Sequence, residues 1–426
     1  MTAAFDRAAL LATFDEVFAD MRNTDVRPVP HFEDIAKPDR RVHRILYLPI
    51  EVKAREFVSK SLIAREAIAQ NFNVIMGASW VLNAWAPYLP SGVVLFKSTN
   101  SIDARSMGQW VQSGHMTGVL DEEVFGIDCT PDFLKATMHP HAAAYADLVC
   151  AQGQSYADVF PFPANVRVTG NPRTLTYKPP QGDDILVCLQ SGNINHAAIK
   201  EYGFAHVVRA VLTLSAGPMN SPLGQAWANI FRQSIEYECD ALPLVRDTIE
   251  ALGAAFPDRT IRVRPHPIEN ADTWAFGRSN IVLETAGGIT DVLGKSSVAV
   301  FVSGCTTGLD ALLAGVPAVR LGRGGHGISA RMHTEVNSAD DAVEAVRRAE
   351  KWDGSIKSHF APVDVMTPLR ELYKQHQADS EIKFSHNVSY TPQVHQLQKF
   401  PETPLEEVAR FVGSPAEQVA WNTWFF

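Results

Sequence analysis

The chain has 426 residues, of which 46% are hydrophobic and 20% are charged, and this length suits two ordinary domains better than one. The net charge of −9 argues against broad nucleic-acid binding, which a basic excess usually accompanies. The sequence holds no uninterrupted run of about 18 apolar residues, as a membrane span needs, and its acid-bearing start is not a signal peptide. Five cysteines without a CxxC pair fit reduced thiols, so we expect a cytoplasmic protein.

The first half alternates short apolar runs with helical patterns, after a leading amphipathic helix at about residues 8–21 and a proline-rich connector. Strands are predicted at residues 44–50, 73–77, 92–96, 116–120, 147–150 and 166–170. Helices are predicted at residues 57–71 and 81–88. Such alternation of strand and helix indicates βαβ crossovers and a parallel sheet.

The second half repeats this pattern. Strands are predicted at residues 184–189, 262–264, 281–283, 297–302 and 317–321. A helix is expected at 227–256, interrupted near Pro243, and another after Gly308. We therefore predict an α/β protein with two Rossmann-like lobes and an active-site cleft between them. The predicted segments are a leading helical segment at 1–40, lobes at 41–175 and 176–350, and a helical tail at 351–426.

Polar clusters fall where predicted strands end, and ligands of open parallel sheets bind at those carboxyl ends. One cluster follows the strand at 297–302, where small hydroxyl residues open a helix. Its free backbone N–H groups and helix dipole suit a phosphate or a carboxylate. The alternative is a helix cap with glycines that permit close packing. The predicted anion-binding residues are Ser303, Cys305, Thr306, Thr307 and Gly308.

A second cluster, at residues 264–270, follows the strand at 262–264. Two prolines fix the backbone around His266, so its imidazole could protonate a leaving phosphate, and Arg264 could add charge-assisted hydrogen bonds. We place Glu269 and Asn270 with the same binding group. The alternative for His266 is a structural role.

A third cluster follows the strand at 116–120, shortly after Gly114-His115. Crowding of Asp121 and Glu122 could raise one pKa toward neutrality and so provide a general base for an acceptor hydroxyl. A solvated acidic loop is the alternative.

A fourth group is divided between two neighbouring strand ends. Mixed charges there could receive a polar acceptor, although ordinary surface ion pairs explain them as well. The residues are Glu51, Lys53, Arg55 and Glu56 after the first strand, and Lys97 and Ser98 after the third.

Several other enzyme classes lack their motifs in this sequence. There is no HExxH and no Cys/His spacing for zinc, and the GxSxG elbow of hydrolases is absent. A GxGxxG string at residues 322–327 follows a late strand but opens no clear helix, which weakens a dinucleotide interpretation. We predict no metal and no cofactor.

Several stretches in order resemble a bacterial family of surface carbohydrate biosynthesis proteins, which look like GT-B glycosyltransferases. The matching stretches span roughly residues 44–325, and they are LPIEVKAREFVSKSLIAREA, VIMG, DEE at 121–123, VTGNPR at 168–173, RPHPIEN at 264–270 and CTTGLDALLAGVP at 305–317. The resemblance implies GT-B architecture, with the nucleotide-sugar donor in the C-terminal lobe and the acceptor in the N-terminal lobe.

Enzymes similar to this family include β-Kdo transferases, which use CMP-Kdo (Kdo is 3-deoxy-manno-oct-2-ulosonic acid). If that similarity extends to the donor, the CMP phosphate and the sugar carboxylate would lie near Thr306, Thr307 and His266. Such a transferase makes a β-linkage from a β-configured donor and retains configuration, which is consistent with a carboxylate nucleophile. Candidates by position are Glu236, Glu238 and Asp240.

The sequence thus predicts a glycosyltransferase that uses a nucleotide sugar, with CMP-Kdo as the best donor candidate, and a bacterial surface glycan or lipid-linked precursor as acceptor. A nucleotide-sugar epimerase or hydrolase and a non-catalytic scaffold of glycan assembly are the alternatives. We expect no nucleic-acid partner. Peripheral contact with the inner face of the membrane stays open because the tail at 421–426 is aromatic.

Overall fold

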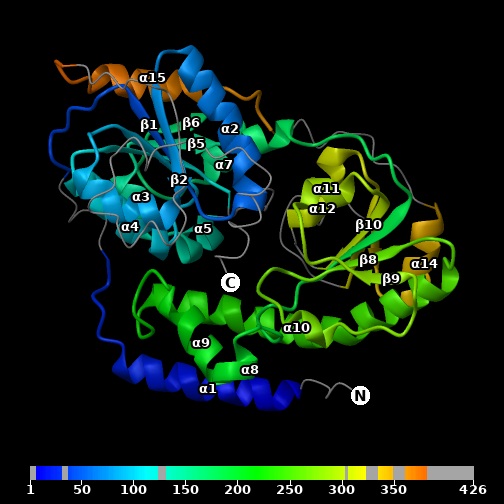
Figure 1. Cartoon of the computed structure of the whole chain (residues 1–426). Helices are drawn as coiled ribbons and strands as arrows, with labels where there is room; N and C mark the ends of the chain where they lie inside the picture. Colours follow the sequence, from blue (N-terminus) through cyan, green and yellow to red (C-terminus); the bar gives the residue numbers. More distant parts are fainter. Residues whose placement is uncertain are drawn as a thin grey trace. The chain divides into compact units, whose positions relative to one another are not determined.

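The structure is a computed structural model that describes residues 6–30, 37–122, 131–302, 306–322, 334–348 and 360–380 (Figure 1). The chain forms two compact units, and each combines segments that are far apart in the sequence. Unit 1 consists of Met1–Val29, Val124–Thr137 and Tyr177–Lys357. Unit 2 consists of Pro30–Glu123, Met138–Thr176 and Ser358–Phe426.

Unit 2 is built on a six-stranded parallel sheet in the order β2-β1-β3-β4-β5-β6. The order reverses beside β1, so β1 and β3 flank a crevice of the kind at which ligands bind. The strands are β1 (Ile45–Ile50), β2 (Asn73–Ala78), β3 (Val93–Phe96), β4 (Met116–Leu120), β5 (Leu148–Ala151) and β6 (Val166–Val168). The helices are α2 (Lys53–Ala69), α3 (Ser79–Trp85), η2 (Ala86–Tyr88), α4 (Ser101–Gln112), α6 (Pro140–Tyr145), α7 (Gln154–Val159), η3 (Pro172–Leu175) and α15 (Met366–Gln375).

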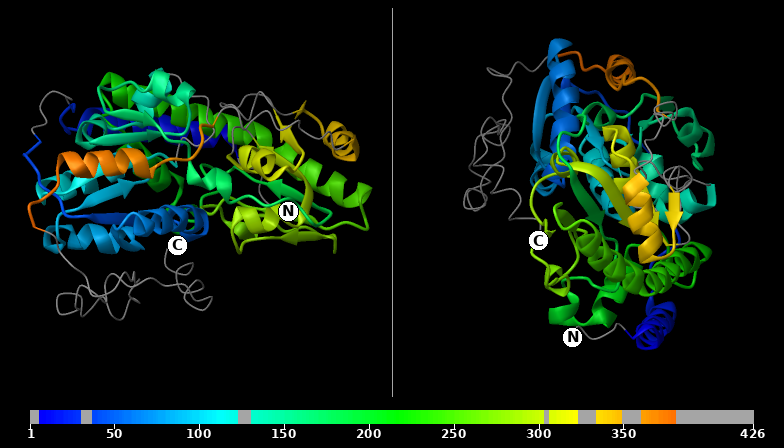
Figure 2. Two further views of the ribbon diagram at one scale, coloured as in Figure 1. Left: turned by 90° about the horizontal axis from the view of Figure 1, so that it is seen from above. Right: turned by 90° about the vertical axis from the view of Figure 1, so that its right-hand side faces the viewer.

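The core of unit 2 joins the sheet to α2 and α15. Side chains that alternate along the strands bury one face of the sheet against these helices, as the period of two requires. Helix α15 comes from the far end of the described chain, yet it packs beside α2 and β5 (Figures 1 and 2). Its buried side chains are Met366, Pro368, Leu369, Leu372 and Tyr373.

Unit 1 is built on a second six-stranded parallel sheet, in the order β12-β11-β10-β7-β8-β9. Counted from β7, this is the 3-2-1-4-5-6 order of the Rossmann fold, with its switch point between β7 and β10. The strands are β7 (Asp184–Cys188), β8 (Ile261–Arg264), β9 (Ile281–Leu283), β10 (Ser296–Val302), β11 (Ala318–Leu321) and β12 (Thr334–Val336). The helices are α1 (Arg7–Thr24), α5 (Pro131–Thr137), α8 (Ile199–Tyr202), α9 (Phe204–Thr213), α10 (Pro222–Ala255), η4 (Ala271–Thr273), α11 (Ile289–Leu293), α12 (Thr306–Ala314) and α14 (Ala339–Arg348).

Helices cover both faces of this sheet. One face packs against α10 and α14, and α1 and α9 join the same core; α11 and α12 cover the other face. The leading helix α1 lies along α9 and α10 (Figure 1). The three layers confirm the predicted α/β class with Rossmann-like units.

The predicted interruption of the long helix near Pro243 is wrong. Helix α10 runs unbroken through this residue, and the buried side chains on both sides of it belong to one continuous face. Proline removes one helical hydrogen bond, but the packing of that face holds the helix together. Helix α15 lies within the predicted helical tail at 351–426, of which only residues 360–380 are among the described residues. Of the helices that the structure describes, none is both long and apolar enough to cross a membrane.

Candidate functional site

In unit 2, Glu56 organises the turn that follows β1. Its carboxylate accepts hydrogen bonds from the backbone N–H of Val52 (2.9 Å) and Glu51 (3.3 Å) and from Lys60 Nζ (3.0 Å). Burial raises the pKa of Glu56, but the charges of Lys60 and Arg55 outweigh it and leave the pKa below its ordinary value. Glu56 therefore holds the start of α2 in place rather than reacting.

The remaining predicted acceptor residues lie at the switch point of this sheet. Lys97, which follows β3, forms an ion pair with Glu51, which follows the neighbouring β1. Ser98 instead donates to Asp103 Oδ2 (2.7 Å), near the start of α4, and burial raises the pKa of Asp103 to about 6. The side chain of Lys53 lies outside the described part of the structure.

Glu122, at the end of β4, is the most unusual carboxylate of this unit. Its side chain is fully buried, and Arg173 Nη1 lies 3.8 Å from Oε2. Neither carboxylate oxygen accepts a hydrogen bond from any described residue. Burial raises the pKa of Glu122 to about 7, although Arg173 lowers it. A carboxylate with this pKa can take up and release a proton near neutrality.

The neighbours of Glu122 in the sequence have structural partners. Tyr156 donates to Asp121 Oδ2 (3.0 Å), and both side chains are buried. His115 is fully buried, its Nδ1 accepts from the N–H of Gly92 (3.2 Å), and burial lowers its pKa to about 4. His115 is therefore a neutral core residue.

In unit 1, Glu269 binds the loop that follows β7. Its two carboxylate oxygens accept from the Ser191 backbone N–H and from Ser191 Oγ, both at 2.8 Å. Two further groups donate to Glu269: Trp274 Nε1 at 2.8 Å and the His266 backbone N–H at 3.3 Å. Glu269 thus joins the ends of β7 and β8, two neighbouring strands of the sheet.

Glu238, from α10, holds the next residues of the same loop. It accepts from the N–H (2.9 Å) and Nδ2 (2.6 Å) of Asn193 and from the N–H of Ile194 (3.2 Å). Burial raises the pKa of Glu238 to about 8, against the effect of these donors. Glu236 instead forms an ion pair with Arg232 of the same helix, and Asp240 forms one with Arg7 of α1. The carboxylates of Glu238 and Glu269 are therefore occupied in holding backbone, as positioning residues are.

His266 and Arg264 lie beside this loop. Nδ1 of His266 accepts from the N–H of Ile268 (3.4 Å). Arg264 donates to the carbonyls of Ala286 (3.1 Å) and Gly287 (2.7 Å). Arg264 thus stabilises the turn between β9 and α11.

Asn270 ties the two loops together. Its N–H donates to the carbonyl of Asn195 (2.8 Å), whose side chain donates back to the carbonyl of Asn270 (3.3 Å). The Asn270 side chain caps the short helix η4 through Asp272. The loops after β7 and β8 therefore form one hydrogen-bonded structure.

The predicted anion site is described only from the first residue of α12 onward. Thr306 opens the helix half-buried, and Thr307 is 9% exposed. A Cβ at Gly308 would lie 2.5 Å from the Phe301 ring, so this glycine is needed for packing of the helix on β10. Two further predicted members lie outside the described residues: Ser303 and Cys305.

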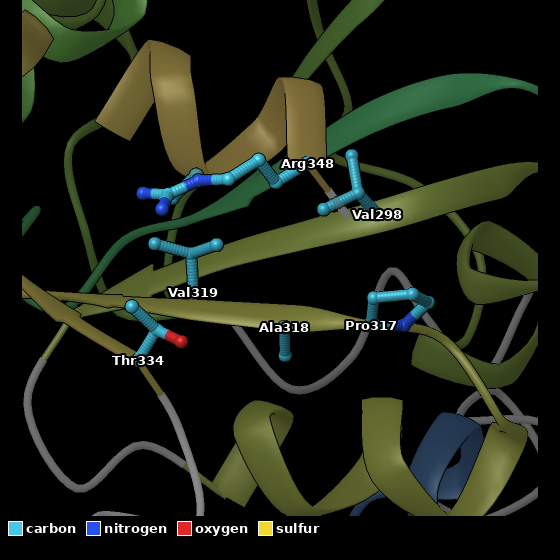
Figure 3. A pocket seen from close by; sticks show the side chains of 7 residues that line it. Val298, Pro317, Ala318, Val319, Thr334 and Arg348 are labelled. Atoms are coloured by element: carbon cyan, nitrogen blue, oxygen red, sulfur yellow. The ribbon is translucent and has the colours of Figure 1, made fainter. Parts of the chain in front are cut away.

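Two small cavities lie in unit 1. One of about 10 Å³, room for roughly one water, lies under the loop after β7 and is lined by Ser191, Glu238 and Trp274 among others. The other, of about 80 Å³, is lined by β10, β11, β12 and α14 (Figure 3). It lies toward the amino ends of these strands, as Pro317 and Thr334 show, and so does not belong to the candidate site. Nowhere in the described ranges do three or more His, Cys, Asp or Glu residues gather as a metal site.

Our sequence analysis did not single out five residues at these strand ends. Ser191 and Asn193 follow β7, and Thr99, Gln152 and Asn171 follow three strands of unit 2. Asn193 lies five residues after the end of β7 and the other four lie within three residues of a strand end, so the alignment of parallel strands could have indicated them. Their hydrogen-bonding state could not be predicted, because it depends on partners far away in the sequence.

No protein-family model matches the chain, and no curated protein matches it. Solved structures of similar fold include S. aureus MnaA with UDP (10% identity, TM-score 0.45, 81% of this chain and 100% of that chain covered). UDP-GlcNAc 2-epimerase from Neisseria meningitidis bound to UDP-GlcNAc has 11% identity and a TM-score of 0.43, with 78% and 98% covered. MurG of Acinetobacter baumannii has 10% identity and a TM-score of 0.38, with 78% and 99% covered. We draw no functional inference from similarities at this level.

Proposed function

We propose that the protein is a glycosyltransferase that moves a sugar from a nucleotide donor to a hydroxyl of an acceptor glycan. The observation that carries this proposal is Glu122, a fully buried carboxylate at a strand end whose pKa is raised to about 7. Perturbed carboxylates of this kind are typical of acid–base catalysts. In the reaction, Glu122 would take the proton of the acceptor hydroxyl. The hydroxyl oxygen would bond to the anomeric carbon. In an inverting reaction the nucleotide phosphate would leave in that same step with the electrons of the broken bond; in a retaining reaction a carboxylate would first have displaced the phosphate and would itself leave in this step.

We assign the donor to unit 1. Support comes from the braced loops at the carboxyl ends of β7 and β8, next to the switch point of a Rossmann-ordered sheet. His266, at the end of β8, would assist the leaving phosphate, and the start of α12 would face the donor's negative charge. Glu238 and Glu269 would act indirectly, by positioning this loop.

The finer assignment, CMP-Kdo as donor and a bacterial surface glycan or its lipid-linked precursor as acceptor, follows from the sequence resemblance. Under this assignment, the enzyme would work in the cytoplasm, at the inner face of the membrane. An epimerase or hydrolase would use the donor alone, and a scaffold would use none.

The first test is thermal unfolding of the full chain with CMP, UDP, GDP, CDP, CMP-Kdo and UDP-N-acetylglucosamine. A ligand that binds only the folded state at ~100 times its Kd adds about 2.7 kcal/mol to stability, so we expect CMP and CMP-Kdo to raise Tm. The variant His266→Ala should keep this shift but lose at least ~100-fold in turnover. A response to UDP alone would replace the CMP donor and bring the epimerase forward. If no nucleotide raised Tm, the non-catalytic scaffold would be the remaining interpretation.

A further inference from the structure

Four buried polar side chains of unit 2 follow four successive strands of the sheet. Thr99 follows β3, Glu122 follows β4, Gln152 follows β5 and Asn171 follows β6, and their exposed fractions are 1%, 2%, 8% and 0%. Five of their polar atoms have no hydrogen-bond partner in the part of the chain that the structure describes: Thr99 Oγ1, Glu122 Oε1, Glu122 Oε2, Gln152 Oε1 and Asn171 Nδ2. Such atoms are rare in folded proteins because leaving them unpaired costs free energy. Their concentration at the carboxyl ends of neighbouring strands therefore requires a reason.

The strand register brings these residues to neighbouring positions. Glu122 and Gln152 fall opposite each other when the pairing of β4 and β5 is continued past the strand ends, and parallel strands are about 4.8 Å apart. The hydrogen bond from the Glu122 N–H to the Lys97 carbonyl (2.8 Å) joins the end of β4 to the segment after β3, one residue out of the β3–β4 register, so Glu122 lies opposite Ser98 and Thr99 is the next residue. The register pairs are Phe96 with Val119, Leu120 with Cys150, and Ala151 with Val168.

The Asn171 side chain is held in a fixed orientation. Its Oδ1 accepts from the N–H of Arg173 (2.9 Å), which identifies Nδ2 as the unpaired atom. The preceding Gly170 has φ +65°, and a Cβ there would lie 2.4 Å from the Ala361 carbonyl oxygen, so only glycine permits this turn. The N–H of Ala361 also donates to the Gln152 carbonyl (2.9 Å). The segment before α15 thus braces two of the four positions.

The five atoms specify the chemistry of a ligand. Three are acceptors on Glu122 and Gln152, one is the Asn171 donor, and the Thr99 hydroxyl can do either. A phosphate or carboxylate brings only acceptors and would add negative charge beside Glu122, and an ammonium group could not accept from Asn171. Hydroxyl groups both donate and accept. Because Arg173 already lies near Glu122, an uncharged ligand leaves the local charge balanced.

We propose that these four residues, Thr99, Glu122, Gln152 and Asn171, bind an uncharged, hydroxyl-rich sugar ring, the acceptor of the transfer. This inference rests on the proposed function, because it places the acceptor hydroxyl beside Glu122. It replaces the charged residues after β1 and β3 as the principal acceptor contacts, since Glu51 and Lys97 pair with each other.

The test is ligand-observed NMR on the full chain, with methyl glycosides of mannose, galactose and N-acetylglucosamine as neutral probes. Glucose 6-phosphate and galacturonate are the anionic probes. We expect at least one neutral glycoside to bind, Thr99→Val to weaken it about 5-fold, and Thr99→Val with Gln152→Met about 20-fold. Thr248→Val is the matched control, because Thr248 Oγ1 is likewise buried without a partner among the described residues, but on α10 of unit 1. Both single variants should keep the wild-type Tm, and the control should keep full affinity.

Binding of anionic probes only, absence of binding by every neutral glycoside, or equal affinity in wild type and Thr99→Val would each overturn the inference. Nucleotide response separates this from the proposed function. If nucleotides raise Tm but no glycoside binds, the proposed sugar site is contradicted and the proposed function is not. If a glycoside binds but no nucleotide raises Tm, the glycosyltransferase is contradicted and the sugar site is supported.

Discussion

Four buried glutamates lie in or against the loops that follow the strands of the two sheets, and they differ in how they are hydrogen-bonded. Glu56, Glu238 and Glu269 each accept at least three hydrogen bonds, largely from backbone N–H groups, and so hold loops in place. Glu122 accepts none from the described residues. A carboxylate in use as a clamp cannot easily take up a proton without releasing its donors. This difference at the scale of single residues is what separates a base from a positioning group.

We expect Glu122→Gln to lower turnover by at least ~100-fold and to remove the rise of activity with pH near 7. The raised pKa also makes the stability of the protein depend on pH, because the folded protein favours the protonated form of Glu122. The contribution of this group is fully present below its ordinary pKa of 4.5 and is lost as pH rises through about 7. The variant, always neutral, should therefore exceed wild type in stability at pH 8 and match it at pH 4. Rate profiles and urea unfolding at both pH values measure this, and Glu236→Gln serves as the surface control. An unchanged pH limb in Glu122→Gln would assign the titration to another group.

The sequence was sufficient to mark Glu122 and His266 as candidates, because both follow predicted strands. It could not distinguish the roles of Glu238 and Glu122. The partners of Glu238 lie about 45 positions earlier, at Asn193 and Ile194, and only the folded chain brings them together. Gln152 was missed because an isolated glutamine carries no chemical signature until its neighbours across the sheet are known.

At the scale of elements, strands were more predictable than helices. Short apolar runs between turns marked the strands that the structure describes to within one or two residues, except β12 (Thr334–Val336), which was not predicted. Helix α10 shows the limit, since a proline at 243 normally breaks a helix, but here burial of a long apolar face outweighs one lost hydrogen bond. The spacing of residues cannot reveal that balance, because it is set by what the helix packs against.

Helix α10 and the loop after β7 should depend on each other through Glu238. We expect Glu238→Ala to lower the free energy of unfolding by about 3 kcal/mol, since one buried and two partly buried donors lose their acceptor. The same variant should bind nucleotide more weakly. Glu236→Ala, on the same helix with an ion pair to Arg232, should change stability by less than about 1 kcal/mol. Urea unfolding and nucleotide titration measure the two effects. Equal stability of the two variants would show that the loop does not need this clamp.

At the scale of the whole chain, each unit takes an essential element from the opposite end of the sequence. Helix α1 supplies Leu11, Phe14, Val17 and Met21 to the core of unit 1, whereas α15 completes the core of unit 2. A cut between the two halves of the sequence would therefore not yield two intact units. The fold class follows from local patterns, but this exchange of terminal helices does not, because a terminal amphipathic helix carries no signal for the sheet it will cover.

Removal of residues 358–426 should unfold unit 2 and leave unit 1 folded. Each large apolar side chain buried by α15 contributes about 1.5–3 kcal/mol, so its four largest together rival the whole stability of a typical domain, about 5–15 kcal/mol. Calorimetry should then show one transition in place of two, and nucleotide should still raise it, because unit 1 keeps all its segments. A shorter truncation that removes only residues 381–426 retains α15 and should keep both transitions. If the longer truncation also kept both, α15 would be dispensable and the remaining elements of the unit 2 core, α2 and α3 among them, would suffice.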